Sequence, residues 1–190
     1  MNTILSLLIC IFLFNSNNVR AQQWQKFDSA PVTIRLDDIF FLDPARGWAI
    51  VPNYSYINPS YKGAIYTTDD GGTTWKTLKD SSTTFYRSIG FSSPDTGWVG
   101  NLGTGSGSTT DTNFLYQTVN GGQSWTPVTN YSGGKPPGIC GIFVVNKNVT
   151  YACGTYYGPP YLMKTTDNGK SWKTIDMSSY AAGLVDLYFT

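Results

Sequence analysis

One stretch of eight residues occurs three times in this chain, at residues 68–75, 118–125 and 165–172. Each copy has Thr at its first position, Asp or Asn at its third, Gly at its fifth and Trp at its eighth. The Trp residues that end the copies are 50 and 47 positions apart. A self-similar period of this length is the signature of a repeat architecture, in which each repeat is one supersecondary unit that packs on its neighbours.

A second repeated pattern precedes the eight-residue stretch. Residues 38–50 read Asp-Ile-Phe-Phe-Leu-Asp-Pro-Ala-Arg-Gly-Trp-Ala-Ile, and residues 88–100 repeat this pattern position for position. A looser third copy at residues 142–154 has Tyr151 where the others have Trp. Each copy predicts a strand, a tight turn and a second strand, because Pro-Asp-Thr-Gly at residues 94–97 is a turn sequence between two apolar runs.

A further strand is predicted directly before each eight-residue stretch, at residues 64–67, 114–117 and 161–164, and a fourth begins at each Trp. Four antiparallel strands at this period are typical of the blades of a β-propeller. After the N-terminal apolar run, no segment shows sustained helical periodicity. The predicted fold class is an all-β β-propeller with four-stranded antiparallel blades, about three of them complete, with partial blades at both ends.

The repeats also set the predicted boundaries. Complete blades are expected at residues 36–80, 86–130 and 138–177. Residues 22–30 are predicted to form the outer strand of a closing blade, and residues 184–190 to begin a fourth blade. Because propellers have at least four blades, three cannot close a ring. We therefore expect the N-terminal fragment of a longer protein. The alternatives are an open arc and closure by an oligomer partner in place of the remaining blades of the same polypeptide.

The N-terminus has the features of a cleaved secretory signal peptide at residues 1–21. An apolar run at residues 4–14 is followed by polar residues and then by Ala21, a small residue suited to cleavage. A run of this length is too short to span a bilayer. The mature chain, residues 22–190, is therefore predicted to be secreted, periplasmic or at the cell surface, with no membrane span after signal removal.

Composition excludes several classes of function. The formal net charge is +1, from 13 basic and 12 acidic residues without a run of one sign, so no nucleic-acid partner is predicted. The chain has no His, and all of its acidic residues are Asp. Histidine-based acid–base chemistry and histidine metal sites are therefore excluded, and we predict no metal and no cofactor.

Two cysteines remain after the signal, Cys140 and Cys153. A two-residue turn between their strands would place them directly opposite each other, whereas a three-residue turn would place them on opposite faces. An oxidising exported location permits a disulfide between them. The alternative is two buried free thiols, and the sequence leaves this choice open.

The eight-residue stretch resembles the Asp-box, or BNR repeat, of the pattern Ser/Thr-x-Asp-x-Gly-x-Thr/Ser-Trp. Together with the Gly-Trp hairpins, it makes the chain similar to the β-propellers of sialidase-like proteins and of photosystem II stability/assembly factors. In the resembled families the Asp-boxes are fold elements that lie away from the active site. Asn120 agrees with this role, because an amide keeps the acceptor oxygen of Asp and loses its charge. The predicted structural residues are Thr68, Asp70, Gly72, Trp75, Thr118, Asn120, Gly122, Trp125, Thr165, Asp167, Gly169 and Trp172.

Topology predicts where a ligand binds. Because strands alternate in direction, the Asp-boxes lie on one face of the disc, and the loops after each second strand and the connectors between blades lie on the other. Function on a rigid scaffold is concentrated on such loops. The alternative is that the tyrosines on these loops only border the disc, half-buried. The predicted ligand face contains Tyr54, Tyr56, Tyr61, Tyr86, Arg87, Tyr131, Lys135, Tyr156 and Tyr157.

The resembled families include glycoside hydrolases, so an enzyme has to be considered. Sialidase-like members use an arginine cluster and a Tyr assisted by Glu, and this chain has no Glu. Xyloglucanase-like members use two Asp across a cleft. Asp37 and Asp38 are consecutive in a predicted strand and are expected to point to opposite faces. Asp111, in a loop, and Asp186, at the start of the last strand, have no visible partner.

No catalytic residue is therefore predicted. The predicted function is an exported non-catalytic module with a binding or scaffold role for a protein or glycan partner. The alternative is part of a secreted glycoside hydrolase, sialidase-like or xyloglucanase-like, whose catalytic residues lie mostly outside this chain.

Overall fold

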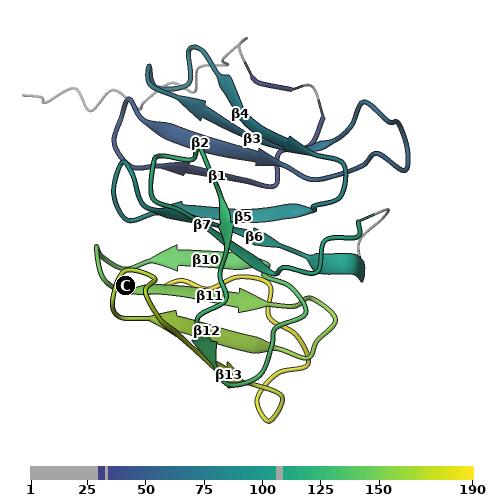
Figure 1. Cartoon of the computed structure of the whole chain (residues 1–190), viewed down its shortest axis with the longest axis vertical. Helices are drawn as coiled ribbons and strands as arrows, with labels where there is room; N and C mark the ends of the chain where they lie inside the picture. The colour runs from purple at the N-terminus through teal and green to yellow at the C-terminus, as the bar shows by residue number, and fades with distance from the viewer. Residues whose placement is uncertain (1–29, 33, 106–108) are drawn as a thin grey trace, which may run out of the picture.

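The computed structural model describes residues 30–32, 34–105 and 109–190. Three sheets follow one another along the long axis of the molecule in the order of the sequence (Figure 1). The first sheet contains β1 (Asp38–Phe41), β2 (Gly47–Val51), β3 (Gly63–Thr68) and β4 (Lys76–Ser81). The second contains β5 (Tyr86–Phe91), β6 (Gly97–Asn101), β7 (Leu115–Thr118) and β8 (Thr126–Pro127), with the 3₁₀ helix η1 (Gly103–Gly105) after β6. The third contains β10 (Gly141–Val144), β11 (Thr150–Gly154), β12 (Tyr161–Thr165) and β13 (Trp172–Asp176), with β9 (Tyr131–Ser132) at its outer edge.

The prediction of an all-β fold built from four-stranded antiparallel sheets is confirmed. The four antiparallel strands of each sheet lie in sequence order, with β9 added beside β13 in the third, and β5 lies between β1 and β10 where the sheets meet. The number of blades and the closure of a ring stay predictions. The predicted signal peptide at residues 1–21, and residues 22–29 of the predicted outer strand, lie outside the described residues.

The last residues, 184–190, have no strand assignment but lie beside β10. A Cβ added to Gly141 would lie 2.9 Å from the Cα of Asp186. The ring of Phe189 stacks on Tyr151 with centroids 4.4 Å apart. This segment therefore packs on the third sheet in the way that β5 packs on the first, without pairing as a strand.

The sequence did not predict β9, which pairs in parallel with β13. β8 spans only two residues, although the Val128 N–H still donates to the Leu115 carbonyl at 2.9 Å, and the chain leaves the second sheet after Val128. It then joins the third sheet: the N–H of Trp172 donates to the Asn130 carbonyl at 3.0 Å, and the Asn130 amide donates to the Lys170 carbonyl at 2.6 Å. The connector therefore fastens the second sheet to the third.

Aromatic side chains join each sheet to the next. Between the first and second sheets, Trp48 stacks on Phe91 with ring centroids 3.6 Å apart, and Trp125 meets Phe91 edge-on. Between the second and third sheets, Trp98 meets Trp172 edge-on at 5.8 Å. Each contact is the centre of a buried apolar cluster made of residues from both sheets. The two clusters are the cores of the molecule.

One face of the first sheet is not covered by another sheet within the described residues. Ile39 and Phe41 on β1 are 52% and 40% exposed. The equivalent residues of the second sheet, Ile89 and Phe91, are 2% and 1% exposed because they pack on the first sheet. The same apolar positions are therefore buried at an inter-sheet contact in one repeat and open in the other.

The three eight-residue stretches form the same hydrogen-bonded turn, here called the repeated turn. The first Thr hydroxyl accepts from the N–H of the fifth residue, Gly, at 2.9, 2.8 and 2.9 Å in the three copies. It donates to the oxygen of the third residue, which also accepts from the N–H of the seventh. The Gly at the fifth position has φ of 91°, 94° and 81°, a left-handed conformation that Gly adopts without strain.

Asn120 preserves this turn without a charge. Its amide nitrogen donates to the Ser124 hydroxyl at 2.9 Å, where the carboxylates of Asp70 and Asp167 instead accept from a hydroxyl. The turns also contact the preceding sheet: the Trp48 indole donates to the Gly121 carbonyl, and the Gln117 amide donates to the Asn168 carbonyl, both at 3.3 Å. These contacts are what a structural role requires of the turn.

The carboxyls of Asp70 and Asp167 make stability depend on pH. Hydrogen bonds from the hydroxyl and the amide of Thr74, and likewise of Ser171, lower the pKa of these carboxyls from 3.8 to about 2. The unfolded chain therefore binds these protons at a higher pH than the folded chain. The stabilisation is complete above about pH 4 and is lost as the pH falls toward 2.

We expect the melting temperature to fall on acidification from about pH 5 to about pH 2. It should fall less in the double variant Asp70→Asn/Asp167→Asn, whose amides reproduce the Asn120 turn and do not titrate. Circular dichroism melts of both proteins across this range measure the difference. Parallel curves would show that the two carboxyls do not contribute.

Candidate ligand site

The first strands of the three repeats, β1, β5 and β10, lie next to one another, and residues 184–190 lie beside β10. When the four segments are aligned by sequence, one equivalent residue of each lies where the segments come together. These four residues, here called the throat, are Asp37, Arg87, Cys140 and Val185. All four line both a cavity of about 540 Å³, here called the mouth pocket, and a cavity of about 420 Å³, here called the channel. The two cavities are therefore contiguous at the throat.

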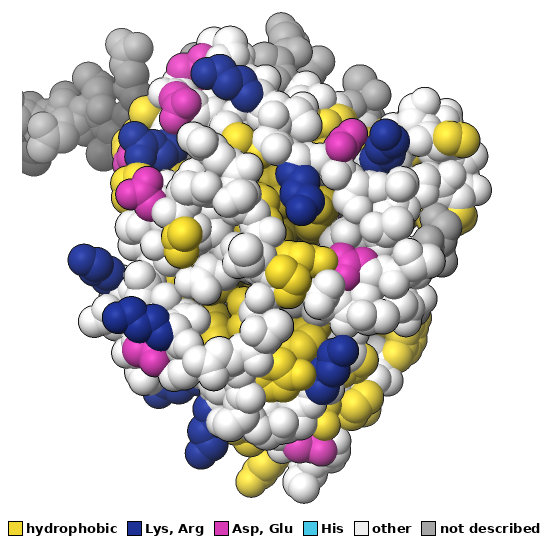
Figure 2. Space-filling model, viewed as in Figure 1, with side chains coloured by type: hydrophobic (Ala, Val, Ile, Leu, Met, Phe, Trp, Pro, Cys, Tyr) yellow, Lys and Arg dark blue, Asp and Glu magenta, His cyan; other side chains and the backbone are white. Residues whose placement is uncertain are grey.

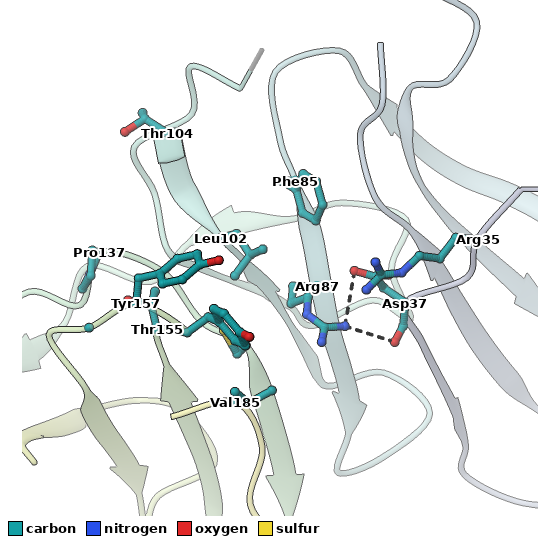
Figure 3. A pocket seen from close by; sticks show the side chains of 13 residues that line it. Arg35, Asp37, Phe85, Arg87, Leu102, Thr104, Pro137, Thr155, Tyr157 and Val185 are labelled. Atoms are coloured by element: carbon teal, nitrogen blue, oxygen red, sulfur yellow. Dashed lines mark hydrogen bonds and ion pairs between the residues drawn. The ribbon is translucent and has the colours of Figure 1, made fainter. Parts of the chain in front are cut away.

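The mouth pocket is formed by the loops after β6 and β11 and by the segments that lead into β1, β5 and β10. These are the loops and connectors on which the sequence predicts the ligand face. Charged side chains lie on one side of the pocket, and Tyr157, Leu102 and Pro137 lie on the other (Figure 3). Besides the throat, the lining residues are Arg35, Phe85, Leu102, Thr104, Pro137, Thr155, Tyr156, Tyr157 and Gly158.

The charged side is a carboxylate held between two arginines. The side chain of Asp37 is 0% exposed and forms ion pairs with Arg35 and Arg87, the latter at 3.3 Å. Neither oxygen of Asp37 accepts a regular hydrogen bond within the described residues, so the guanidinium charges are what compensate its burial. Burial raises the pKa of the Asp37 carboxyl, and the charges of Arg87 and Arg35 offset part of that rise.

Arg35 is the more accessible of the two arginines. Its side chain is 56% exposed, against 23% for Arg87. It also donates to the hydroxyl of Tyr54 at 3.3 Å. Arg87 is anchored further by donating to the main-chain carbonyl of Asp37 at 3.5 Å. Arg87 therefore has a fixed position, whereas Arg35 presents its guanidinium to the pocket opening.

The aromatic side is a pair of tyrosines on the loop after β11. Tyr157 is 91% exposed and Tyr156 59%. Their rings are perpendicular, with centroids 4.5 Å apart. The loop is held by the Thr155 carbonyl, which accepts from the N–H groups of Gly158 and Leu184 at 3.2 and 3.0 Å. Large aromatic surface is thus exposed on a loop with a fixed main chain, as at many binding sites.

The structure brings part of the predicted ligand face together. Arg87, Tyr156 and Tyr157 line the mouth pocket. Tyr54 adjoins it, because its ring packs edge-on against Phe85 at 5.8 Å and its hydroxyl bonds Arg35. Tyr56 packs on Tyr54 and is 56% exposed; Tyr61 is half-buried and closes the same loop through its main-chain bond to Tyr54.

Three predicted residues lie elsewhere. The inclusion of Tyr86 in a surface is wrong: it is 1% exposed, because its side chain enters the apolar cluster between the first two sheets. Tyr131 lies in β9, packs edge-on against Phe114 at 5.2 Å and lines a groove at the outer edge of the third sheet. Lys135 is exposed and does not line any of the described cavities.

The cysteines are two buried free thiols, which resolves the choice left open by the sequence against a disulfide. The turn at residues 146–148 has three residues, closed by the bond from Val145 N–H to the Val149 carbonyl. Gly141 therefore pairs with Cys153, and Cys140 is one residue out of register. Burial raises the pKa of both thiols, that of Cys153 to about 12.

The channel contains further carboxylates, and they bind main-chain amides. Asp38 accepts from the N–H of Ile39 at 2.8 Å and from the N–H of Ile89 at 2.9 Å. Asp186 accepts from the N–H of Leu187 at 2.8 Å. The expectation that Asp37 and Asp38 face opposite ways is wrong, because Asp37 precedes β1 and both line the channel. Ion pairs hold the carboxylate of Asp37, and main-chain amides hold that of Asp38, so the two are not placed as a catalytic pair.

Asp111 has partners that the sequence did not reveal. Its carboxylate accepts from the hydroxyls of Thr84 at 2.7 Å and Tyr116 at 2.5 Å, and from the N–H of Asn113 at 3.0 Å. Burial raises its pKa, but the hydrogen bonds from Tyr116 and Thr84 outweigh burial and lower it. Asp111 therefore tethers the loop after β6 to the second sheet.

Sequence reasoning did not place Arg35, Asp37 and Phe85 on the ligand face. One signal could have found part of this cluster: in the aligned repeats Asp37 stands at the position of Arg87. Equivalent positions of neighbouring repeats lie side by side, so opposite charges there predict an ion pair. Arg35 and Phe85 have no such signal, because they lie in connectors whose paths the repeats do not fix.

The face of the molecule drawn in Figure 2 carries no large charged patch. Hydrophobic side chains gather in a hollow in the middle of that face, whereas Lys and Arg are spread singly over it (Figure 2). Among residues 30–32, 34–105 and 109–190, no three His, Cys, Asp or Glu side chains are grouped so that they could hold a metal ion. No helix in these ranges has the length and apolar character that crossing a membrane requires.

Comparison with solved structures shows the fold. YCF48 bound to a D1 peptide matches with a TM-score of 0.54 and 23% identity, over 77% of this chain and 42% of that chain. A GH74 enzyme of Niastella koreensis matches with a TM-score of 0.49 and 18% identity, over 72% and 22%. YCF48 from Cyanidioschyzon merolae gives 0.41 and 16%, over 83% and 62%. This chain spans less than half the length of the first of these, and that likeness supports a fold of β-propeller type. No protein-family model and no curated protein matches the sequence.

Proposed function

We propose that this chain is an exported, non-catalytic β-propeller module that binds a segment of a protein partner in the mouth pocket. The repeated turns are then Asp-boxes that hold the sheets together. Export rests on the signal-like pattern of residues 1–21. The remaining blades are proposed to come from the same polypeptide or from an oligomer partner, packed on the open face of the first sheet that carries Ile39 and Phe41.

One observation carries the proposal: two exposed tyrosines and an accessible arginine converge on one pocket of about 540 Å³. Binding energy at protein interfaces is concentrated in Tyr, Trp and Arg side chains that meet the partner around an apolar hollow. A cavity of this size accommodates a few residues of a polypeptide. The complex of YCF48 with a D1 peptide supports a peptide as the kind of ligand.

The alternative is a glycoside hydrolase. That chemistry needs two carboxyl groups about 5–9.5 Å apart across the substrate. Asp37 is the one carboxylate among the lining residues of the mouth pocket, and two arginines neutralise it. Hydrolysis would therefore need groups from outside this pocket. Turnover of sialosides or β-glucans by the purified chain would favour the alternative.

Tyr157→Ala is expected to weaken binding of peptides selected from a random peptide array by about tenfold or more. The ring is almost fully exposed, so its removal takes contact area from the ligand without disturbing a core. Binding of the same peptides to the unchanged chain and the variant, measured by biolayer interferometry, tests this.

Tyr180→Ala is the matched control, since Tyr180 is also largely exposed, at 82%, and does not line the mouth pocket. Its peptide affinity should equal that of the unchanged chain. A glycan array is screened in parallel. Binding to glycans but to no peptide, or equal losses in the two Tyr variants, would contradict the proposal.

A further inference from the structure

Several main-chain and carboxylate acceptors of the mouth pocket are already engaged, whereas its arginine can still donate. Arg35 presents a guanidinium that donates only, and its side chain is 56% exposed. The carboxylate of Asp37 already lies between two guanidinium groups. The main-chain carbonyl of Phe85 accepts from Leu102 N–H at 3.0 Å, and that of Thr155 accepts from two N–H groups. The Thr and Tyr hydroxyls of the lining donate as well as accept, so a ligand rich in acceptors and poor in donors matches the pocket best.

The aromatic side of the pocket has a defined shape. The rings of Tyr156 and Tyr157 stand at 87° to each other and form a corner. The apolar side chains of Leu102, Pro137 and Val185 continue this surface toward the throat. A flat, rigid aliphatic group packs against such a corner with little loss of conformational entropy.

Resting on the proposed function, we infer that the ligand of the mouth pocket is a proline-rich segment in the polyproline II conformation. Proline has no N–H, so the segment brings carbonyl acceptors without donors that need partners. In this helix the carbonyls form no internal hydrogen bonds and stay free for Arg35 and the tyrosine hydroxyls. Docking of proline rings between exposed aromatic rings is a general mode of peptide recognition.

The rival ligands fit less well. An ordinary extended peptide carries one N–H per residue, which needs an acceptor, and the fixed acceptors of the pocket that are described above are already engaged. A glycan brings many hydroxyl donors, and for these the same main-chain and carboxylate acceptors are engaged. An acidic peptide would use the arginines, but Asp37 already neutralises one of the two charges, and most of the remaining lining is apolar.

The test uses fluorescence anisotropy with the full chain and four probes: a capped all-proline peptide of about ten residues, its counterpart with alternate alanines, an acidic peptide of the same length and a xyloglucan oligosaccharide. The all-proline peptide should bind at least about tenfold more tightly than each of the others. Because this ligand is uncharged, its affinity should change little between about 50 and about 300 mM salt.

Three variants, one of them a control, assign the contacts. Tyr157→Ala should weaken binding of the all-proline peptide by about tenfold or more, and Tyr180→Ala should leave it unchanged. Arg35→Lys keeps the charge but loses the planar pair of donors, so it should weaken binding by about threefold or more.

The outcomes separate this inference from the proposed function. If array peptides bind in the mouth pocket and the all-proline peptide does not, the inference fails and the proposed function stands. Equal affinity for the proline and alanine probes, or tight salt-sensitive binding of the acidic probe alone, likewise overturns the inference. If the oligosaccharide alone binds, both fail.

Discussion

Replacing Trp98 with Ala is expected to lower the free energy of unfolding by about 3–5 kcal/mol. Trp98 is 0% exposed on β6 and packs edge-on against Trp172, at the centre of the contact between the second and third sheets. Its indole nitrogen has no hydrogen-bond partner among the described residues, so the whole loss is one of packing. Urea unfolding followed by circular dichroism measures the change.

Trp75→Ala is the comparison for this result. Trp75 ends the first repeated turn, is only half-buried and packs on Phe41, which is itself 40% exposed. Its loss should cost less than half as much as the loss of Trp98. Equal losses would show that stability does not depend on the aromatic contact between sheets.

Gly97→Ala should destabilise the protein by about 1–3 kcal/mol, although Ala is otherwise acceptable in a strand. A Cβ at this position would lie 2.5 Å from the ring of Phe91. That ring cannot move away, because it is 1% exposed, stacks on Trp48 at 3.6 Å and meets Trp125 edge-on. The same urea measurement applies.

Gly47→Ala provides the matched control, because Gly47 occupies the equivalent position in the first repeat. Its added Cβ would lie 2.7 Å from the ring of Phe41. This ring borders solvent and can rotate aside, so the cost should stay below about 1 kcal/mol. A loss as large as that of Gly97→Ala would contradict the claim that this position is packed in the second repeat and open in the first.

The repeats made most of the fold predictable. Trp48 and Trp98 lie on β2 and β6, and Tyr151 lies on β11, at the same register in each sheet. The sequence could align these positions because each strand of a repeat has the same neighbours in every copy. The exceptions lie outside the repeated pattern. The connector after the two-residue β8 forms β9, and residues 184–190 pack on β10 without pairing as a strand.

Only those residues of the site that lie on loops with a predictable direction could be placed from the sequence. Topology placed Arg87, Tyr156 and Tyr157 at the mouth pocket, because loop direction follows from strand order. It could not place Arg35, which reaches the pocket through a connector. It also misjudged Tyr86, since residues at the end of a connector can turn inward as a strand begins, and burial at such a point depends on the neighbouring sheet.

Hydrogen–deuterium exchange of the chain with a bound peptide tests the central claim most directly. Binding at the mouth pocket predicts slower amide exchange at residues 35–37, 85–87, 137–140 and 155–158, and unchanged exchange at the repeated turns. Protection concentrated at residues 68–75, 118–125 and 165–172, with none around the throat, would contradict the claim, since it would make the repeated turns the binding surface.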